Sequence, residues 1–249
     1  MSETDLVDLS LADLSLVDLS LADLNLAHLR LLQLVSPNLP TGAFTYSQGL
    51  EWAVECGWLQ DINDTRNWLR SILDDSLQYL ELPLLIRLYN AAQTKNTDDF
   101  FHWSQRLFAS RETFELRNEE TQRARALFSL LKKLPESKNW LELKNNQQAL
   151  FASQIAGYAL AASHWNITLN NLLLGYTWSW LENAVVVAIK LVPLGQSDGQ
   201  QLLYELSSHI NASVEQAFKI SDDEIGASTA AMAIASSLHE TQYTRLFRS

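Results

Sequence analysis

Three pairs of adjacent acidic residues are the first places in this sequence where acid–base chemistry could occur. They are Asp74-Asp75, Glu119-Glu120 and Asp222-Asp223. General acid–base catalysis needs two groups that converge on one bond, whereas consecutive residues on a helix point about 100° apart. We therefore interpret all three pairs as solvated helix faces.

The histidines and the single cysteine form no metal-binding or nucleophilic pattern. No two of the five histidines have the i, i+4 spacing that brings two imidazoles to one metal ion. At His239-Glu240 a transient metal contact is one interpretation, but solvated polar residues at a helix end explain the pair more simply. Cys56 has no basic neighbour to stabilise a thiolate, so we interpret it as a small buried hydrophobe. We expect no bound metal and no cofactor.

Glu182 lies among aromatic residues, in the segment Trp178-Ser-Trp-Leu-Glu-Asn183. A carboxylate in such surroundings requires a partner or a raised pKa. Lys190 follows on roughly the same helix face, too far along to pair directly. A structural ion pair elsewhere is the favoured interpretation, and contact with a partner protein is the alternative. A second hypothesis, that Tyr176, Trp178 and Trp180 bind a cofactor or substrate of an enzyme, competes with simple core packing.

Motifs for nucleotide and hydrolase chemistry are absent. The chain has no GxxxxGK(S/T) phosphate loop, no GxGxxG and no GxSxG. Gly195 and Gly199 are four residues apart, but the required lysine and hydroxyl do not follow them. The sequence therefore predicts a non-catalytic protein that works by binding other proteins.

Composition indicates a helical, cytoplasmic protein. The 249 residues are 47% hydrophobic but include only 8 Gly and 5 Pro, which disfavours a turn-rich β fold. A net charge of -11 argues against nucleic-acid binding, and one cysteine excludes an intramolecular disulfide. Aspartates recur from Asp5 to Asp23, so the start does not have the apolar core of a signal peptide, and we expect no membrane span.

The first 34 residues contain a degenerate five-residue repeat (DLVDL, SLADL, SLVDL, SLADL, NLAHL). Its leucines alternate at spacings of two and three, so on a helix they would scatter around the axis, and an amphipathic helix is a poor interpretation. The units Ala12-Asp-Leu14 and Ala22-Asp-Leu24 resemble pentapeptide-repeat proteins, but the stretch would complete little more than one coil. We expect residues 1–27 to be a mobile acidic extension or a helix that orders on docking; an anion-mimicking module is the alternative.

Residues 28–249 are expected to form one all-α domain of consecutive helices. Thr45 or Ser47 would cap a helix that ends at Gly57, and Asp61 or Asp64 would cap the next. Leu172–Leu191 is the most apolar segment and is expected to be the central, mostly buried helix. Further helices are expected over about 81–95, 98–108, 111–132, 150–163, 200–219 and 225–241.

Four segments resemble the UreF family of urease accessory proteins. They are LLQLVSPNLPTGAFTYSQGLE (31–51), SRETFELR (110–117), WSWLEN with KLVPLGQSDGQ (178–200) and the ending HETQYTRLFRS (239–249). The resemblance spans about residues 28–249. It implies a helical, homodimeric protein that binds the accessory protein UreD (also called UreH) and recruits the GTPase UreG for GTP-dependent nickel delivery to apo-urease.

The same resemblance suggests which residues contact partners. It implies that Tyr46 and Arg245 build the recruitment surface and that Lys190 contacts UreG. An arginine can fix a loop through several donors, and a lysine beside a Gly/Asp break can reach an acidic partner. The other predicted partner-binding residues lie in the matched motifs: Ser47, Glu51, Glu182, Gln196, Asp198, His239, Glu240, Tyr243, Leu246, Phe247 and Arg248.

The chain departs from the family pattern at two places. Gln122-Arg123-Ala124 stands where the family often has Q-M-G, and Ser228-Thr229 stand near the position of a family proline. These changes affect the expected local helix packing. A third hypothesis, that Arg245 is supplied to UreG as an arginine finger, remains open beside the scaffold hypothesis.

Overall fold

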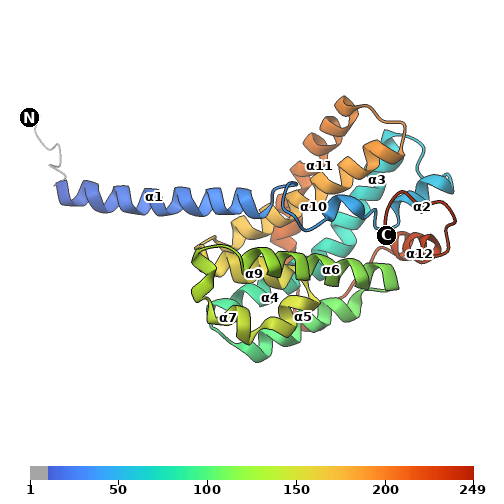
Figure 1. The fold of residues 1–249 in the computed structure, drawn as a ribbon. Coiled ribbons are helices and arrows are strands. Elements are labelled where there is room, and N and C mark those ends of the chain that lie inside the picture. The colour runs from blue at the N-terminus through green and yellow to red at the C-terminus, as the bar shows by residue number, and fades with distance from the viewer. Residues whose placement is uncertain (1–10) are drawn as a thin grey trace, which may run out of the picture.

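The computed structural model describes residues 11–249, with side chains from Ala22 onward. Within these residues every regular element is a helix, and none is a strand, so the predicted all-α class is confirmed (Figure 1). The elements are α1 (Leu11–Leu34), η1 (Ala43–Thr45), α2 (Leu50–Glu55), α3 (Ile62–Ser71), η2 (Ile72–Glu81), α4 (Leu82–Gln93), α5 (Thr97–Ser110), α6 (Phe114–Leu131), η3 (Glu136–Asn139), α7 (Leu141–Asn145), α8 (Gln147–Ala152), α9 (Gln154–His164), α10 (Leu169–Leu191), α11 (Gln196–Ala217), η4 (Asp222–Glu224) and α12 (Ala230–His239).

Local sequence signals set several helix ends. The Asp61 side chain accepts hydrogen bonds from the amides of Asn63 and Asp64, which confirms it as the cap of α3. Gly57 follows α2 with a φ of 76°, as expected of a left-handed residue after a helix. The predicted cap of α2 is wrong, because Gly49 precedes the helix and neither Thr45 nor Ser47 occupies that position.

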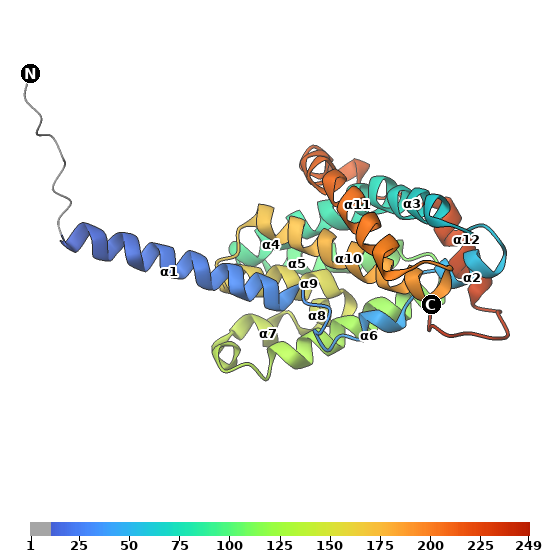
Figure 2. The same ribbon diagram turned by 90° about the horizontal axis from the view of Figure 1, so that it is seen from above.

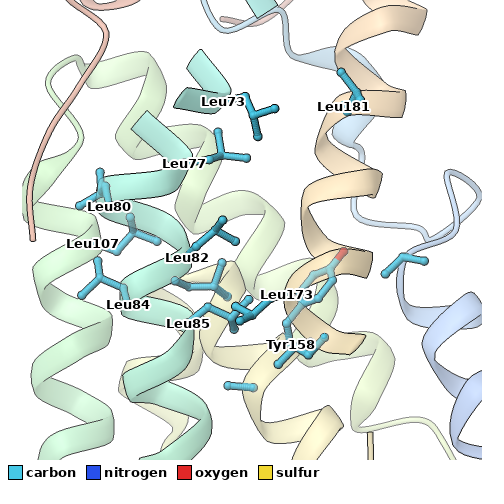
Figure 3. Packing of buried hydrophobic residues seen from close by; sticks show 14 of the residues in the cluster. Leu73, Leu77, Leu80, Leu82, Leu84, Leu85, Leu107, Tyr158, Leu173 and Leu181 are labelled. Carbon is cyan, nitrogen blue, oxygen red and sulfur yellow. The ribbon is translucent and has the colours of Figure 1, made fainter. Parts of the chain in front are cut away.

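The core is built around α4, whose leucines Leu82, Leu84, Leu85 and Leu88 are completely buried. It packs against α5 and α9 and continues from α3 through the π-helical η2 without a break. Figure 3 shows Leu77 of η2 and Leu85 of α4 on the side toward α10, whereas Leu80 and Leu84 lie on the opposite side beside Leu107 of α5. This burial of apolar surface is the main force that holds the bundle together.

Helix α10 is less enclosed than expected. It packs along α11, and its residues Leu172, Leu173 and Leu181 are fully buried, but Trp178 and Val186 on another side are 37% and 38% exposed. Only 44% of its most apolar window is buried, so the prediction of a mostly buried helix is wrong. By length and composition α10 could span a membrane, a property that the core helix of a soluble bundle shares.

Helix α1 extends away from the bundle in both views (Figures 1 and 2). Its C-terminal end packs on α10 at Gly175, where an added Cβ would lie 2.8 Å from the Leu31 side chain. From Leu11 the repeat forms a helix, which is one of its two expected forms, and this helix is not amphipathic, as expected. Four leucines are 48–64% exposed: Leu24, Leu26, Leu29 and Leu32. The first ten residues of the predicted extension lie outside the described residues.

Candidate functional site

The last ten residues, 240–249, follow α12 and are called the C-terminal segment below. In Figures 1 and 2 this segment leaves α12, runs outward and returns to the body beside α2 and α10. Its returning end is held by side chains of α2, α6 and the loop 45–49. Residues that are far apart in the sequence therefore meet at one site.

Glu51, in the first turn of α2, is the residue that binds the C-terminal segment most directly. One carboxylate oxygen accepts the Leu246 amide at 2.6 Å, and the other accepts the Phe247 amide at 2.9 Å. The second oxygen also lies 3.1 Å from Nε2 of His239. Because Glu51 is only 7% exposed, these charge-assisted hydrogen bonds are made away from water, where they are strongest.

His239, the last residue of α12, is completely buried between two carboxylates. Its Nδ1 lies 2.7 Å from Oε2 of Glu115, the second residue of α6. The other Glu115 oxygen accepts a hydrogen bond of 2.7 Å from Arg245. Glu240 accepts from the amides of Phe114 and Glu115, so it caps the start of α6 and joins α12 to it.

The end of the C-terminal segment is bound to the loop that precedes α2. The Ser47 amide donates to the carbonyl oxygen of Ser249 at 2.6 Å, and the Ser47 hydroxyl donates to the same oxygen. The Arg248 amide donates to the Thr45 carbonyl at 2.9 Å. The Ser249 hydroxyl donates to Glu119 at 3.2 Å. Backbone groups dominate these contacts, so the segment is positioned as an extended chain.

Gly49 allows this loop to lie close to α12. Its φ is 82°, and an added Cβ would lie 2.7 Å from the backbone nitrogen of Ser236. We expect Gly49→Ala to lower the free energy of unfolding by about 3 kcal/mol, through left-handed strain and overpacking. Gly42→Ala is the matched control, because Gly42 has a φ of 74° but open space around it. It should cost about 1 kcal/mol. If denaturant unfolding gave the same loss of unfolding free energy for both variants, the contact of Gly49 with α12 would be unimportant.

A second buried ionic cluster lies beneath this site. Arg111 donates to Glu81 at 2.7 Å and to Glu120 at 2.8 and 3.1 Å, and all three residues are at most 8% exposed. Burial alone would lower the pKa of Arg111, but the two carboxylates raise it well above its usual value. Burial and the same carboxylates raise the pKa of Tyr176 nearby. The ion pairs of Arg111 therefore join η2 to α6.

The cavity between the two clusters has a volume of about 20 Å³. It is lined by Gln48, Arg123, Gln154, Tyr176 and Trp180 among others. This space fits about one water molecule. Tyr176 and Trp180 therefore surround closely packed polar side chains, and an organic cofactor would not fit between them.

The surface around the C-terminal segment exposes large apolar side chains. Tyr243 is fully exposed, Leu246 is 69% exposed, and Phe114 at the start of α6 is 68% exposed. Phe247 is instead buried, with the Lys190 ammonium 5.9 Å from the centre of its ring. Apolar side chains left exposed beside fixed backbone are typical of protein-binding surfaces.

Most of the predicted site residues meet at this place, although not all face solvent. Tyr46, Ser47, Glu51, His239 and Phe247 are buried, so their contacts are internal. The remaining predicted residues of the segment that lie on the surface are Glu240, Tyr243, Arg245, Leu246 and Arg248. Lys190 is also exposed, above Phe247.

Three predicted residues lie apart from the C-terminal segment. Asp198 accepts the Gly195 amide at 2.8 Å and so caps α11, next to the exposed Gln196. Glu182 is half-buried, and among the described side chains no cation pairs with it, so the expected structural ion pair is not found. Burial raises the pKa of Glu182.

Several interpretations of single residues were wrong. Glu119 and Glu120 are buried and paired with Arg123 and Arg111, not solvated. His239 is also buried, whereas Cys56, which follows the last residue of the short helix α2, is exposed. Among the described residues, no group of His, Cys, Asp and Glu is arranged to hold a metal ion.

Sequence reasoning missed Glu115, Glu119 and Gln48 as site residues. Glu119 and Arg123 have the i, i+4 spacing of a helical ion pair, and this signal was available in the sequence. Arg123 is also the departure from the family pattern at Gln122-Arg-Ala124. Its pairing with Glu119, which in turn binds Ser249, gives the substitution a local function.

Comparisons with known proteins agree with this geometry. A family model described as UreF matches residues 59–207. The chain is 56% identical to the urease accessory protein UreF of Alcanivorax borkumensis, over 88% of this chain and 96% of the relative. It is 49% identical to the UreF of Pseudomonas putida KT2440 and 44% identical to that of Enterobacter sp. 638, with the same coverage.

Proposed function

Because this chain belongs to the UreF family of urease accessory proteins, we propose that it is the scaffold that binds UreD and recruits UreG during urease maturation. In this proposal it acts in the cytoplasm, as a homodimer, without catalysis of its own. UreG supplies the GTP chemistry that accompanies nickel delivery to apo-urease. The family membership supports the accessory role, and the contacts of the C-terminal segment support the choice of surface.

One observation carries the proposal: the C-terminal segment is held by buried groups while several of its side chains remain exposed. Glu51 and Glu115 fix the backbone and Arg245, and Tyr243 and Leu246 remain exposed. Such an arrangement loses little conformational entropy when a partner binds, because the segment is already ordered. Apolar side chains with flanking arginines resemble the centre and rim of a protein interface.

We assign this surface to UreD and a neighbouring one to UreG. Lys190, at the end of α10, lies beside the C-terminal segment through Phe247, and Gln196 and Asp198 follow at the start of α11. Lys190 presents an exposed ammonium that can reach an acidic surface of UreG. Glu182, exposed in part on the same helix, completes this proposed contact.

Deletion of residues 240–249 is the first test. We expect the shortened chain to lose the ternary complex with UreD and UreG in co-purification, because the deletion removes Tyr243, Arg245 and Leu246 together. Thermal unfolding of the shortened chain shows whether the bundle remains folded. A complex that survives the deletion would contradict the proposed role of the segment.

The arginine-finger hypothesis receives less support from the geometry. Arg245 donates to Glu115 at 2.7 Å, so its guanidinium is already engaged within the chain. We therefore expect Arg245→Ala to leave the GTP turnover of the assembled UreG complex within about twofold, against the 10³–10⁵-fold typical of arginine fingers. A loss of that larger size, measured with the complex still assembled, would establish Arg245 as a catalytic finger.

A further inference from the structure

The hydrogen bonds of His239 determine which of its nitrogens carry protons. Nδ1 lies 2.7 Å from a Glu115 oxygen, and Nε2 lies 3.1 Å from a Glu51 oxygen. An ionised carboxylate only accepts hydrogen bonds, whereas a neutral imidazole has one donor and one acceptor nitrogen. A neutral His239 would therefore direct a nitrogen lone pair at a carboxylate oxygen inside a buried site.

With both carboxylates ionised, the charges at this site balance when His239 is a cation. Glu51 of α2 and Glu115 of α6 each contribute a negative charge, and Arg245 contributes one positive charge. Arginine keeps its proton, so a neutral histidine would leave one buried negative charge without compensation. Glu240, also close to α6, adds no positive charge and already accepts two backbone amides.

From these two observations we infer that His239 is a doubly protonated positioning residue that holds the C-terminal segment against the body. Glu51 is the connecting group, because its carboxylate binds His239 and also the amides of Leu246 and Phe247. Loss of one imidazole proton leaves a nitrogen lone pair that repels the carboxylate of Glu51 or Glu115. The displaced carboxylate then no longer holds both amides, and the segment is released.

This inference predicts a pH dependence with a defined sign. The segment is docked while His239 carries both protons, and it is released as the pH rises and one proton leaves. The exposed residues Tyr243 and Leu246 are fixed only in the docked state. His239 would therefore make the surface that we propose for UreD sensitive to pH, but the docking itself is a property of the isolated chain.

The test uses the full chain without partners, so its outcome is independent of the proposed function. Nitrogen NMR of the ¹⁵N-labelled imidazole reports the protonation of Nδ1 and Nε2 across mildly acidic to mildly alkaline pH. Amide hydrogen exchange of Leu246 and Phe247, corrected for the intrinsic effect of pH, reports docking. We expect the second imidazole proton and the amide protection to be lost together, while the buried amide of Ala188 in α10 stays protected.

His239→Gln should reduce the protection of these two amides by roughly tenfold or more, as expected from losing a hydrogen bond to a charged group. His102→Gln is the matched control, because His102 is exposed and distant in sequence. If either ring nitrogen of the native protein were unprotonated while both amides stayed protected, the inference would be wrong. This native measurement decides the question even if the variant does not fold.

Discussion

Replacing Arg111 by methionine is expected to lower the free energy of unfolding by about 3–5 kcal/mol, the cost of leaving buried charges without a partner. The substitution keeps much of the apolar volume of the side chain but removes the cation from Glu81 and Glu120, which are 4% and 6% exposed. The two carboxylates belong to η2 and α6, so the loss acts on the junction of two long helices. Denaturant unfolding measures it.

Arg70→Met is the matched control for Arg111. Arg70 also pairs with a carboxylate, that of Asp74 at 3.0 Å, but both side chains are at least 39% exposed. This change should cost less than about 1 kcal/mol. A loss of unfolding free energy that is equal in both variants would contradict the importance of the buried cluster.

The second large effect is expected at the exposed side chains of the C-terminal segment. Tyr243→Ala combined with Leu246→Ser should weaken UreD binding by about 30-fold or more, the size of a binding hot spot. Neither side chain is buried in the free chain, so the free energy of unfolding should stay within about 0.5 kcal/mol. Calorimetric titration with UreD and denaturant unfolding measure the two quantities.

Tyr204→Ala is the control for that experiment. Tyr204 lies on α11 and is 83% exposed, so its removal changes the same kind of apolar surface at another place. The affinity for UreD should change by less than about threefold, as expected for a surface residue outside the interface. If Tyr204→Ala weakened UreD binding and the Tyr243/Leu246 variant did not, the UreD-binding surface would lie on α11 instead.

Helices were predictable from the sequence where the periodicity was strong and the end signals were local. Asp61 caps α3 through the amides two and three residues later, and Trp68 and Leu69 on its apolar face are buried. Such features depend on neighbours within one or two turns, which a sequence displays directly. Helix α1 was only one of two expected forms of the repeat, because a leucine pattern without a stripe neither predicts a helix nor prevents one from forming.

The electrostatics of the site could not be predicted in the same way. His239 is 124 residues from Glu115 and 188 residues from Glu51, so no local pattern indicates that they meet. An adjacent pair such as Glu119-Glu120 appears solvated when only its own helix is considered. In the structure the pair is buried, and its two carboxylates pair with Arg111 and Arg123. The family motifs pointed to residues that meet at the C-terminal segment, and the long-range contacts show how these residues are held.

Hydrogen exchange of the complex with UreD, compared with the free chain, tests the central claim most directly. If UreD docks on the C-terminal segment, backbone amides near Phe114, Leu238 and Tyr243 to Leu246 should gain protection, while α11 near Tyr204 should be unchanged. Protection that appears on α11 and is absent from residues 238–248 would contradict the claim that this segment is the surface through which the protein binds UreD.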